Sequence, residues 1–197
     1  MVEVKYNGDA LWARIERAVE NVKIRLRRVC GALNAAQIPY AVVGGNAVQY
    51  WVAQVDESVV RNTQDVDIII NEADLPQVRQ VLEGMGFVYA RSSGITMFLD
   101  GPDAKARDAV HVLFAGQKVR ETDVAPVPEI EPHAWLNQSR TLPLERLVQM
   151  KLTAFRDKDR VHIRDMISIN LIDDTWPARY PPILAARLKE LLADPEG

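Results

Sequence analysis

The sequence predicts an α/β (α+β) fold in which a mixed β-sheet is flanked by helices, with further helices added at both ends. Strand-like and helix-like patterns alternate between about residues 38 and 115, and this order is typical of such sheets. Long helical patterns precede and follow that region. We therefore expect an N-terminal helix over 1–37, a core over 38–142 and a C-terminal helical segment over 143–197. The length of 197 residues suits one compact domain made of all three.

The first helix is expected from about Asp9, a suitable N-cap, to Gln37. Its predicted buried face consists of apolar residues at helical spacing: Leu11, Ile15, Ala18, Val22, Leu26 and Val29. The same helix has a basic cluster made of Lys23, Arg25, Arg27 and Arg28. A solvated face balanced by nearby glutamates is favoured for this cluster, and an RNA-contact patch is the alternative.

The remaining elements follow from apolar runs and from glycine and proline positions. The expected strands cover residues 40–43, 65–70, 87–90, 95–99 and 109–115. The expected helices cover residues 46–54, 73–84, 143–156, 160–172 and 181–193. Three prolines between Thr122 and Pro132 predict a loop or crossing arm. The four tryptophans lie in four different segments and are expected to pack in the core or between helices.

Composition excludes several classes of protein. With 48% apolar and 26% charged residues, the chain is not a disordered tail, a fibre or a coiled-coil rod. The formal net charge of −3 gives no global basic field for a nucleic-acid partner. A single cysteine, Cys30, excludes an internal disulfide framework. The start lacks the pattern of an export signal and no apolar run could span a membrane, so a cytoplasmic protein is expected.

Two glycines, Gly44 and Gly45, lie between the first expected strand and a helix that includes Asn46. Glycine permits a tight turn, and backbone N–H groups at the start of a helix favour a bound anion. An ordinary turn at the end of a strand is the alternative.

Two aspartates, Asp65 and Asp67, lie on the expected strand over 65–70. Alternation along a strand places both carboxylates on one face, about 6–7 Å apart along the chain, while Val66 and Ile68 face the core. Like charges on one face repel, so a compensating cation is expected. Mg²⁺ fits because it binds carboxylate and phosphate oxygens together. The alternatives are a strand edge exposed to water or a pairing with Arg61.

A lysine, Lys151, lies within or beside the apolar stripe of the helix that Pro143 opens. A lysine in that position either extends its ammonium group to water along the helix or faces an anion.

Together, Gly44-Gly45, Asp65-x-Asp67, Lys151 and the later Arg164-Asp165 resemble the nucleotidyltransferase superfamily with the DNA polymerase β-type catalytic core. The resemblance covers about residues 38–172. It is greatest to the bacterial branch that contains abortive-infection and toxin–antitoxin nucleotidyltransferases. The arrangement of Arg61, Thr63 and the two aspartates is also similar to that of small antibiotic-modifying nucleotidyltransferases.

This resemblance implies a polymerase β-type fold and a Mg²⁺-dependent reaction. The reaction would transfer a nucleoside monophosphate from a nucleoside triphosphate to a hydroxyl group, and pyrophosphate would leave. A transfer RNA end, a protein hydroxyl and a small metabolite are all possible acceptors. Positioning and charge neutralisation would supply most of the catalysis.

The resemblance also implies a role for each matched residue. Asp65 and Asp67 would bind Mg²⁺. Lys151 would neutralise the triphosphate. The other matched positions would contact phosphate: Gly44, Gly45, Asn46, Arg61 and Thr63. For Arg61 and Thr63, the alternative is that they brace the strand that carries the aspartates.

The family supplies a third carboxylate from a later strand, whereas alternation along residues 108–114 places His111 at that position. Asp108 has the opposite parity. Histidine acts as a base near neutral pH but is a poor Mg²⁺ ligand beside carboxylates. Three outcomes are open: His111 is the base, Asp108 substitutes for the missing acid, or catalysis is lost. In the third case the protein would bind a nucleotide or a partner protein, for example in a toxin–antitoxin or defence system.

Overall fold

A seven-stranded sheet forms the centre of the protein in the computed structural model, which describes residues 4–195. Residues 1–3 and 196–197, the outermost parts of the two expected terminal segments, lie outside the described residues. The strands are β1 (Ala41–Val43), β2 (Val66–Ile70), β3 (Val88–Ser92), β4 (Ile95–Leu99), β5 (Val110–Phe114), β6 (Ala134–Leu136) and β7 (Ser139–Thr141). Their order is β3-β4-β5-β2-β1-β7-β6. β2 runs parallel to β5 and β1 parallel to β7, while the other neighbours are antiparallel, which confirms the predicted mixed sheet.

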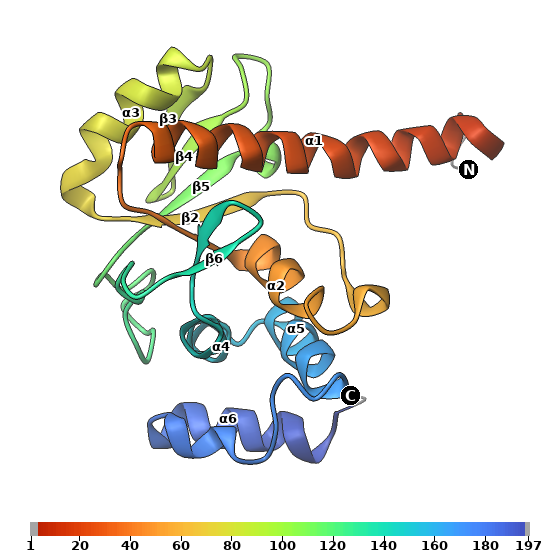
Figure 1. The fold of residues 1–197 in the computed structure, drawn as a ribbon, viewed down its shortest axis with the longest axis vertical. Coiled ribbons are helices and arrows are strands. Elements are labelled where there is room, and N and C mark those ends of the chain that lie inside the picture. The colour runs from red at the N-terminus through yellow and green to blue at the C-terminus, as the bar shows by residue number, and fades with distance from the viewer. Residues whose placement is uncertain (1–3, 196–197) are drawn as a thin grey trace.

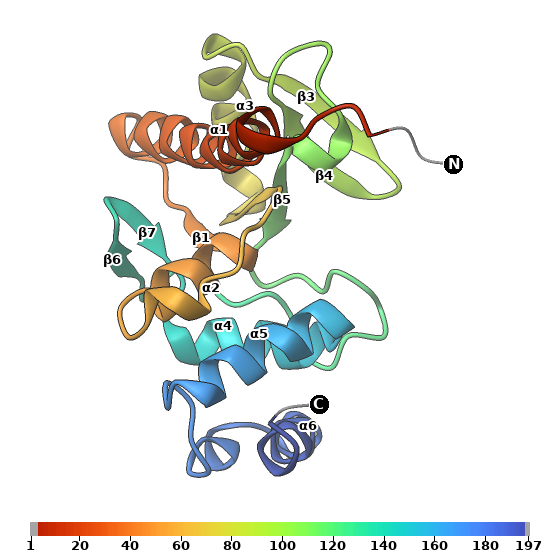
Figure 2. The same cartoon turned by 90° about the vertical axis from the view of Figure 1, so that its right-hand side faces the viewer.

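Helices lie at both ends of the sheet (Figure 1 and Figure 2). Two of them, α1 and α3, pack against each other at one end, and three others, α4, α5 and α6, pack together at the opposite end. α2 packs on β1 and β2 and reaches α4 and α5. The helix bounds are α1 (Gly8–Ala35), α2 (Gly44–Val52), α3 (Leu75–Gly84), α4 (Leu144–Ala154), α5 (Asp157–Ser168) and α6 (Pro182–Ala193).

The central strand β2 explains why the sheet holds together. Four of its five residues, Val66, Ile68, Ile69 and Ile70, are fully buried, because neighbouring strands flank β2 and helices cover it. A strand covered in this way has a continuous apolar run. The exception is Asp67, which is half-buried. Asp67 therefore interrupts an otherwise apolar strand, and Asp65 lies immediately before it.

The predicted buried face of the first helix is only half correct. Val22, Leu26 and Val29 are buried, but Leu11 and Ile15 are more than 40% exposed. The N-terminal half of α1 extends past the rest of the molecule (Figure 1), so its apolar side has no surface to cover. The spacing of apolar residues predicts that a helix is amphipathic, but it does not show that another part of the protein covers the apolar face. The helix also begins at Gly8 with Asn7 as N-cap, rather than at Asp9.

The basic cluster of this helix, for which an RNA-contact patch was the alternative, is partly offset by acidic side chains of the same molecule. Arg25 and Arg28 both bind the carboxylate of Asp100, at 3.2 and 2.6 Å, and Arg27 pairs with Glu20. Three of the four basic residues therefore have acidic partners within the molecule, and the two acids offset half of the cluster's charge.

Other boundaries also differ from the predictions. The hairpin of β6 and β7 was not foreseen; its second strand pairs with β1 at Val42. α5 begins at Asp157 instead of residue 160, where the carboxylate of Asp159 accepts a hydrogen bond from the backbone N–H of Arg156. Two tryptophans, Trp12 and Trp135, are mostly exposed instead of packed in the core. Along residues 4–195, we find no helix with both the length and the apolar character needed to span a bilayer.

Candidate active site

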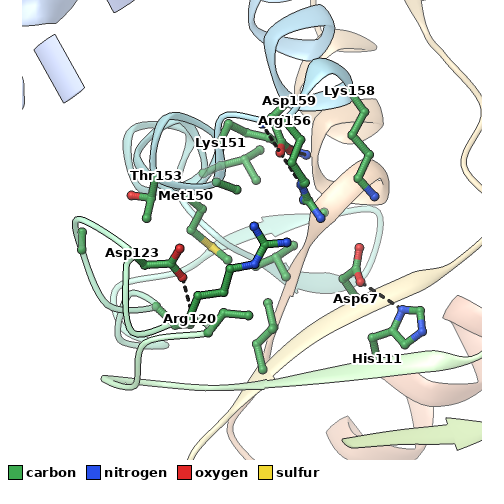
Figure 3. Close-up of a pocket in the computed structure, with 18 of the residues that line it drawn as sticks. Asp67, His111, Arg120, Asp123, Met150, Lys151, Thr153, Arg156, Lys158 and Asp159 are labelled. Atoms are coloured by element: carbon green, nitrogen blue, oxygen red, sulfur yellow. Dashed lines mark hydrogen bonds and ion pairs between the residues drawn. The ribbon is translucent and has the colours of Figure 1, made fainter. Parts of the chain in front are cut away.

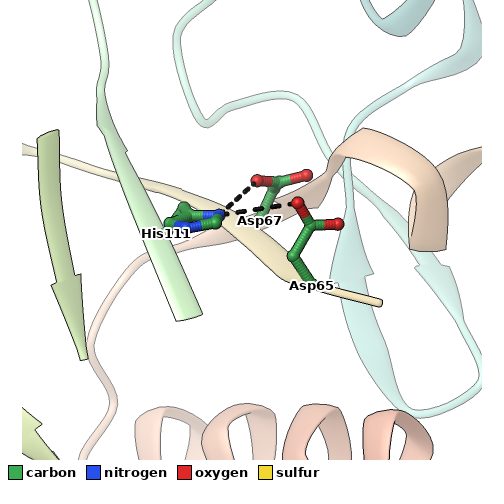
Figure 4. A group of neighbouring side chains, drawn as sticks. All are labelled: Asp65, Asp67 and His111. Atoms are coloured by element: carbon green, nitrogen blue, oxygen red, sulfur yellow. Dashed lines mark ion pairs between the residues drawn. The ribbon is translucent and has the colours of Figure 1, made fainter. Parts of the chain in front are cut away.

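Two parallel strands bring three candidate catalytic side chains together. Asp67 on β2 is paired in register with His111 on β5, and Asp65 lies immediately before β2. One ligand atom from each of these residues lies within 4.8 Å of the other two (Figure 4). The alternation predicted from the sequence therefore holds for both strands. This cluster of two carboxylates and one imidazole can hold a metal ion.

The imidazole of His111 is fixed on both sides. Its Nε2 donates a hydrogen bond to the carbonyl of Ala106 at 3.1 Å. Its Nδ1 lies 3.4 Å from Asp67 Oδ1 and 3.7 Å from Asp65 Oδ2. The hydrogen bond with Asp67 raises the pKa of His111 above its usual value, against the opposing effect of burial, and the charges of both aspartates add to the rise. A proton on Nδ1 offsets one of the two negative charges of the carboxylates.

Neighbouring polar groups hold Asp65 in place. Thr63 Oγ1 donates to Asp65 Oδ1 at 2.9 Å, and the buried amide of Asn46 donates to the Asp65 carbonyl at 2.8 Å. Both donors, Thr63 and Asn46, were expected from the sequence to contact the nucleotide. In the structure, these two side chains brace the strand that carries the carboxylates.

Gly44 and Gly45 form the first turn of α2, not a turn that precedes it. Gly44 has a φ of +66°, and a Cβ atom on it would overlap the carboxylate of Asp67. A Cβ on Gly45 would lie 2.7 Å from Thr63 Oγ1. Only glycine lets the start of α2 approach the aspartates so closely. The N–H groups of this turn therefore lie beside the carboxylates, where they favour an anion.

Lys151 is buried on α4 and forms an ion pair with Asp159 on α5, with Nζ 3.0 Å from Oδ1. Arg156 binds the same carboxylate through Nε at 2.7 Å. Burial lowers the pKa of Lys151, and the charge of Asp159 partly opposes this. Burial also acts to raise the pKa of Asp159, but the two cations lower it overall. The sequence left open whether the ammonium group of Lys151 reaches water or faces an anion. In the structure it faces an anion, the carboxylate of Asp159.

A cavity of about 330 Å³ connects these groups (Figure 3). Five of the predicted site residues line it: Gly44, Asp65, Asp67, His111 and Lys151. The loop between β5 and β6 and the beginning of α5 contribute further charged groups that the sequence did not indicate: Arg120, Asp123, Arg156, Lys158 and Asp159. Part of the segment 156–160 therefore faces the cavity. No sequence signal marks Arg120, because its position depends on the path of a long loop.

The other predicted residues lie around the cavity and do not line it. Arg61 extends to Asp165 on α5 and binds it through two hydrogen bonds of 2.5 and 3.0 Å. This pairing, rather than one with the aspartates of β2, neutralises Arg61. Asp108 lines a separate hollow beside α1. Arg164 donates to the carbonyl of Asp194 near the C-terminal end.

Comparison with known proteins identifies the fold. No family model matches the chain, and no curated protein matches it in sequence. An antigenic nucleotidyltransferase-like protein from Paracoccidioides brasiliensis is 18% identical, with a TM-score of 0.58 over 89% of each chain. The chain has the nucleotidyltransferase fold. A second structure, ANT(2'')-Ia in complex with adenylyl-2''-tobramycin, is 11% identical, with a TM-score of 0.52 over 87% of this chain and 97% of that chain.

The predicted polymerase β-type architecture, a mixed sheet with helices at both ends, is confirmed. The relationship to the toxin–antitoxin branch stays a prediction from the sequence.

Proposed function

We propose that the protein is a nucleotidyltransferase that transfers a nucleoside monophosphate from a nucleoside triphosphate to a hydroxyl acceptor with the help of a divalent cation. One observation carries this proposal. Asp65 and Asp67 share a cavity with the N-terminus of α2 at Gly44. A cation site beside an anion site is what a metal–triphosphate complex needs.

The donor set fits a divalent cation. Two carboxylates within reach of one another repel unless positive charge lies between them, and oxygen ligands suit hard cations. Asp65 and Asp67 would hold the ion, which the sequence predicts to be Mg²⁺. When bound, the cation would neutralise charge that develops on the phosphates.

The protein's own residues position the triphosphate. The N–H groups at the start of α2 would bind phosphate oxygens. Arg120 and Lys158 line the cavity, and both are exposed cations that can approach a polyanion. Lys151 would act as a buried charge that also holds the α4–α5 turn in place through Asp159. By the resemblance, His111 would stand where the family has its third carboxylate.

The acceptor is a hydroxyl compound to be found by screening. The three candidates from the sequence are a transfer RNA end, a protein hydroxyl and a small molecule. ANT(2'')-Ia, whose structure is a complex with adenylyl-2''-tobramycin, is a precedent for a small-molecule acceptor on this fold.

Calorimetric titration of ATP, GTP, CTP and UTP tests the proposal. Each is titrated with and without divalent cation against the wild type and the Asp65→Asn/Asp67→Asn variant. We expect metal-dependent binding of one triphosphate that the double substitution removes. Transfer of the α-labelled form of that nucleotide to an acceptor would then establish the reaction. If the wild type binds no triphosphate, the proposal is wrong.

The second candidate is a protein that binds a nucleotide or a partner protein without catalysis. The observation in its favour is the imidazole at the third catalytic position. Metal-dependent triphosphate binding with no transfer to any acceptor would support this candidate, and pulldown of a partner protein would be the next experiment. A place in a toxin–antitoxin or defence system belongs to this candidate.

A further inference from the structure

The third position of the metal cluster is the most unusual feature of the site, because it presents nitrogen where Mg²⁺ prefers oxygen. We propose that His111 coordinates the metal ion through Nδ1 and that the site therefore selects Mn²⁺ over Mg²⁺. This inference rests on the proposed function and specifies the cation of the same site.

The backbone sets the position of His111. β5 is hydrogen-bonded to β2 in parallel register, and His111 lies opposite Asp67. The imidazole therefore projects from a rigid strand on the same side of the sheet as the two carboxylates (Figure 4). Ligands on neighbouring strands stay in place without a bound ion, unlike ligands on a mobile loop.

The Ala106 carbonyl selects which ring nitrogen faces the cluster. A carbonyl oxygen only accepts hydrogen bonds, so Nε2 must hold its hydrogen at the 3.1 Å contact. In the neutral ring, the form that binds a metal, Nδ1 then has the lone pair, and it points toward Asp65 Oδ2 and Asp67 Oδ1. Histidine ligands of metals commonly donate their other N–H to a backbone carbonyl in this way, which fixes the tautomer and the ring orientation.

The three acceptor atoms face each other, and each needs a positive partner. A bound cation satisfies all three at once. The other two histidines differ: Nδ1 of His133 contacts only Glu131, and Nδ1 of the largely buried His162 has no hydrogen-bond partner. Among the histidines, all of which lie in the described part of the chain, only His111 meets two carboxylates.

The ligand set decides between cations. Mg²⁺ is bound almost entirely by oxygen and dehydrates reluctantly, so replacing an oxygen ligand with imidazole weakens its binding. Mn²⁺ accepts carboxylate oxygens as Mg²⁺ does, and like other first-row transition ions it also binds imidazole. A site with two carboxylates and one imidazole therefore favours Mn²⁺.

The experiment measures metal binding directly. Mn²⁺ and Mg²⁺ are each titrated calorimetrically into the full-length wild type, His111→Ala and His111→Asp. We expect the wild type to bind Mn²⁺ at least about tenfold more tightly than Mg²⁺. His111→Ala should weaken Mn²⁺ binding about tenfold or more and leave Mg²⁺ binding little changed. His111→Asp, which restores the family's carboxylate, should shift the preference toward Mg²⁺.

Pulsed electron paramagnetic resonance of bound Mn²⁺ supplies the decisive signature. Coupling to an imidazole nitrogen should be present in the wild type and in the control His133→Ala, and absent in His111→Ala. Circular dichroism establishes that each variant is folded, and His111→Gln serves as a second variant if His111→Ala is not.

The outcomes separate this inference from the proposed function. If Mn²⁺ binds in a way that Asp67→Asn abolishes, but without nitrogen coupling, His111 is not a ligand and the inference is overturned, while nucleotidyl transfer can still occur. Equal affinity of the wild type for both ions also overturns it. Nitrogen coupling in a protein that binds no triphosphate would support the inference and contradict the proposed function.

Discussion

Arg61 and Asp165 connect the loop before β2 to helix α5, 104 residues later in the chain. Both guanidinium contacts are hydrogen bonds to one carboxylate, at 2.5 and 3.0 Å. Asp165 raises the pKa of Arg61, which is the direction expected for a cation with a nearby anion. The pair fixes the C-terminal helices relative to the loop that leads into Asp65. One side of the cavity is thereby held against the other.

Replacing Arg61 with alanine should weaken this connection. Asp165 would keep its low exposure without a cation, but Arg61 itself is more than half exposed, so solvent screens the pair. We expect a loss of about 1 kcal/mol in the free energy of unfolding, measured by urea denaturation with tryptophan fluorescence. Arg79→Ala, which removes an exposed pair within α3, is the matched control and should change stability by less. Equal effects of the two substitutions would show that the Arg61 pair has no special role.

Gly44 tests the close approach between α2 and Asp67. In Gly44→Ala, the new Cβ overlaps the Asp67 carboxylate, and the positive φ adds strain of about 1–2 kcal/mol. We expect loss of divalent-cation and triphosphate binding in calorimetry. Gly86→Ala is the matched control, because Gly86 has a φ of +86° but no atom within 4 Å of an added Cβ. It should be destabilised by similar strain and bind normally; loss of binding in both would trace the defect to stability alone.

The sequence was sufficient for features that follow from backbone periodicity. The side-chain period of two along β2 and β5 fixed which residues share a face, so Asp65, Asp67 and His111 were grouped correctly. The two glycines also indicated the position of α2, although they form its first turn instead of preceding it. Such features depend only on local backbone geometry. Pairing of β2 and β5 in register then brings the side chains of the two strands together.

The features that were missed depend on long-range contacts. Lys151 could not be matched with Asp159 in advance, because the pairing requires the reversal of the chain between α4 and α5 at Phe155, which has a φ of +48°. Arg120 reaches the cavity only because the loop after β5 folds back beside α4. Arg25 and Arg28 of α1 likewise form ion pairs with Asp100, which lies in a turn far away in the sequence.

The ion pair of Lys151 and Asp159 has two separable roles. Lys151→Ala leaves the carboxylate of Asp159, with 1% exposure, paired with Arg156 alone. A buried charge that loses a partner destabilises a protein by about 3–5 kcal/mol, and the remaining arginine should hold the loss near the lower value. The double variant Lys151→Met/Asp159→Leu buries no charge at these positions and should recover most of the lost stability. Urea denaturation measures both changes.

Triphosphate binding distinguishes the structural role of Lys151 from its predicted electrostatic role. If Lys151 neutralises phosphate, the double variant should be stable but should bind triphosphate more weakly than the wild type in calorimetry. Wild-type affinity in the stable double variant would mean that Lys151 only supports the fold.

His162 should make the protein sensitive to acid. Burial lowers its pKa to about 4, and the charge of Lys151 acts in the same direction, with Asp159 and Asp165 opposing. The unfolded chain has the usual pKa of about 6.5 and therefore binds the proton more readily than the folded protein. Stability from this residue is complete above about pH 6.5 and is lost as the pH falls toward 4, by up to roughly 3 kcal/mol.

The variant His162→Leu removes this proton linkage and the buried Nδ1 that has no hydrogen-bond partner. Its free energy of unfolding should fall less than that of the wild type between pH 7 and pH 4.5, as followed by urea denaturation at each pH. Carboxylates protonate in both proteins, so the difference between the two pH profiles isolates the histidine. His133→Ala, which leaves His162 in place, should follow the wild-type profile. Parallel profiles for the wild type and His162→Leu would contradict the prediction, because the folded protein would then bind the proton on His162 as readily as the unfolded chain does.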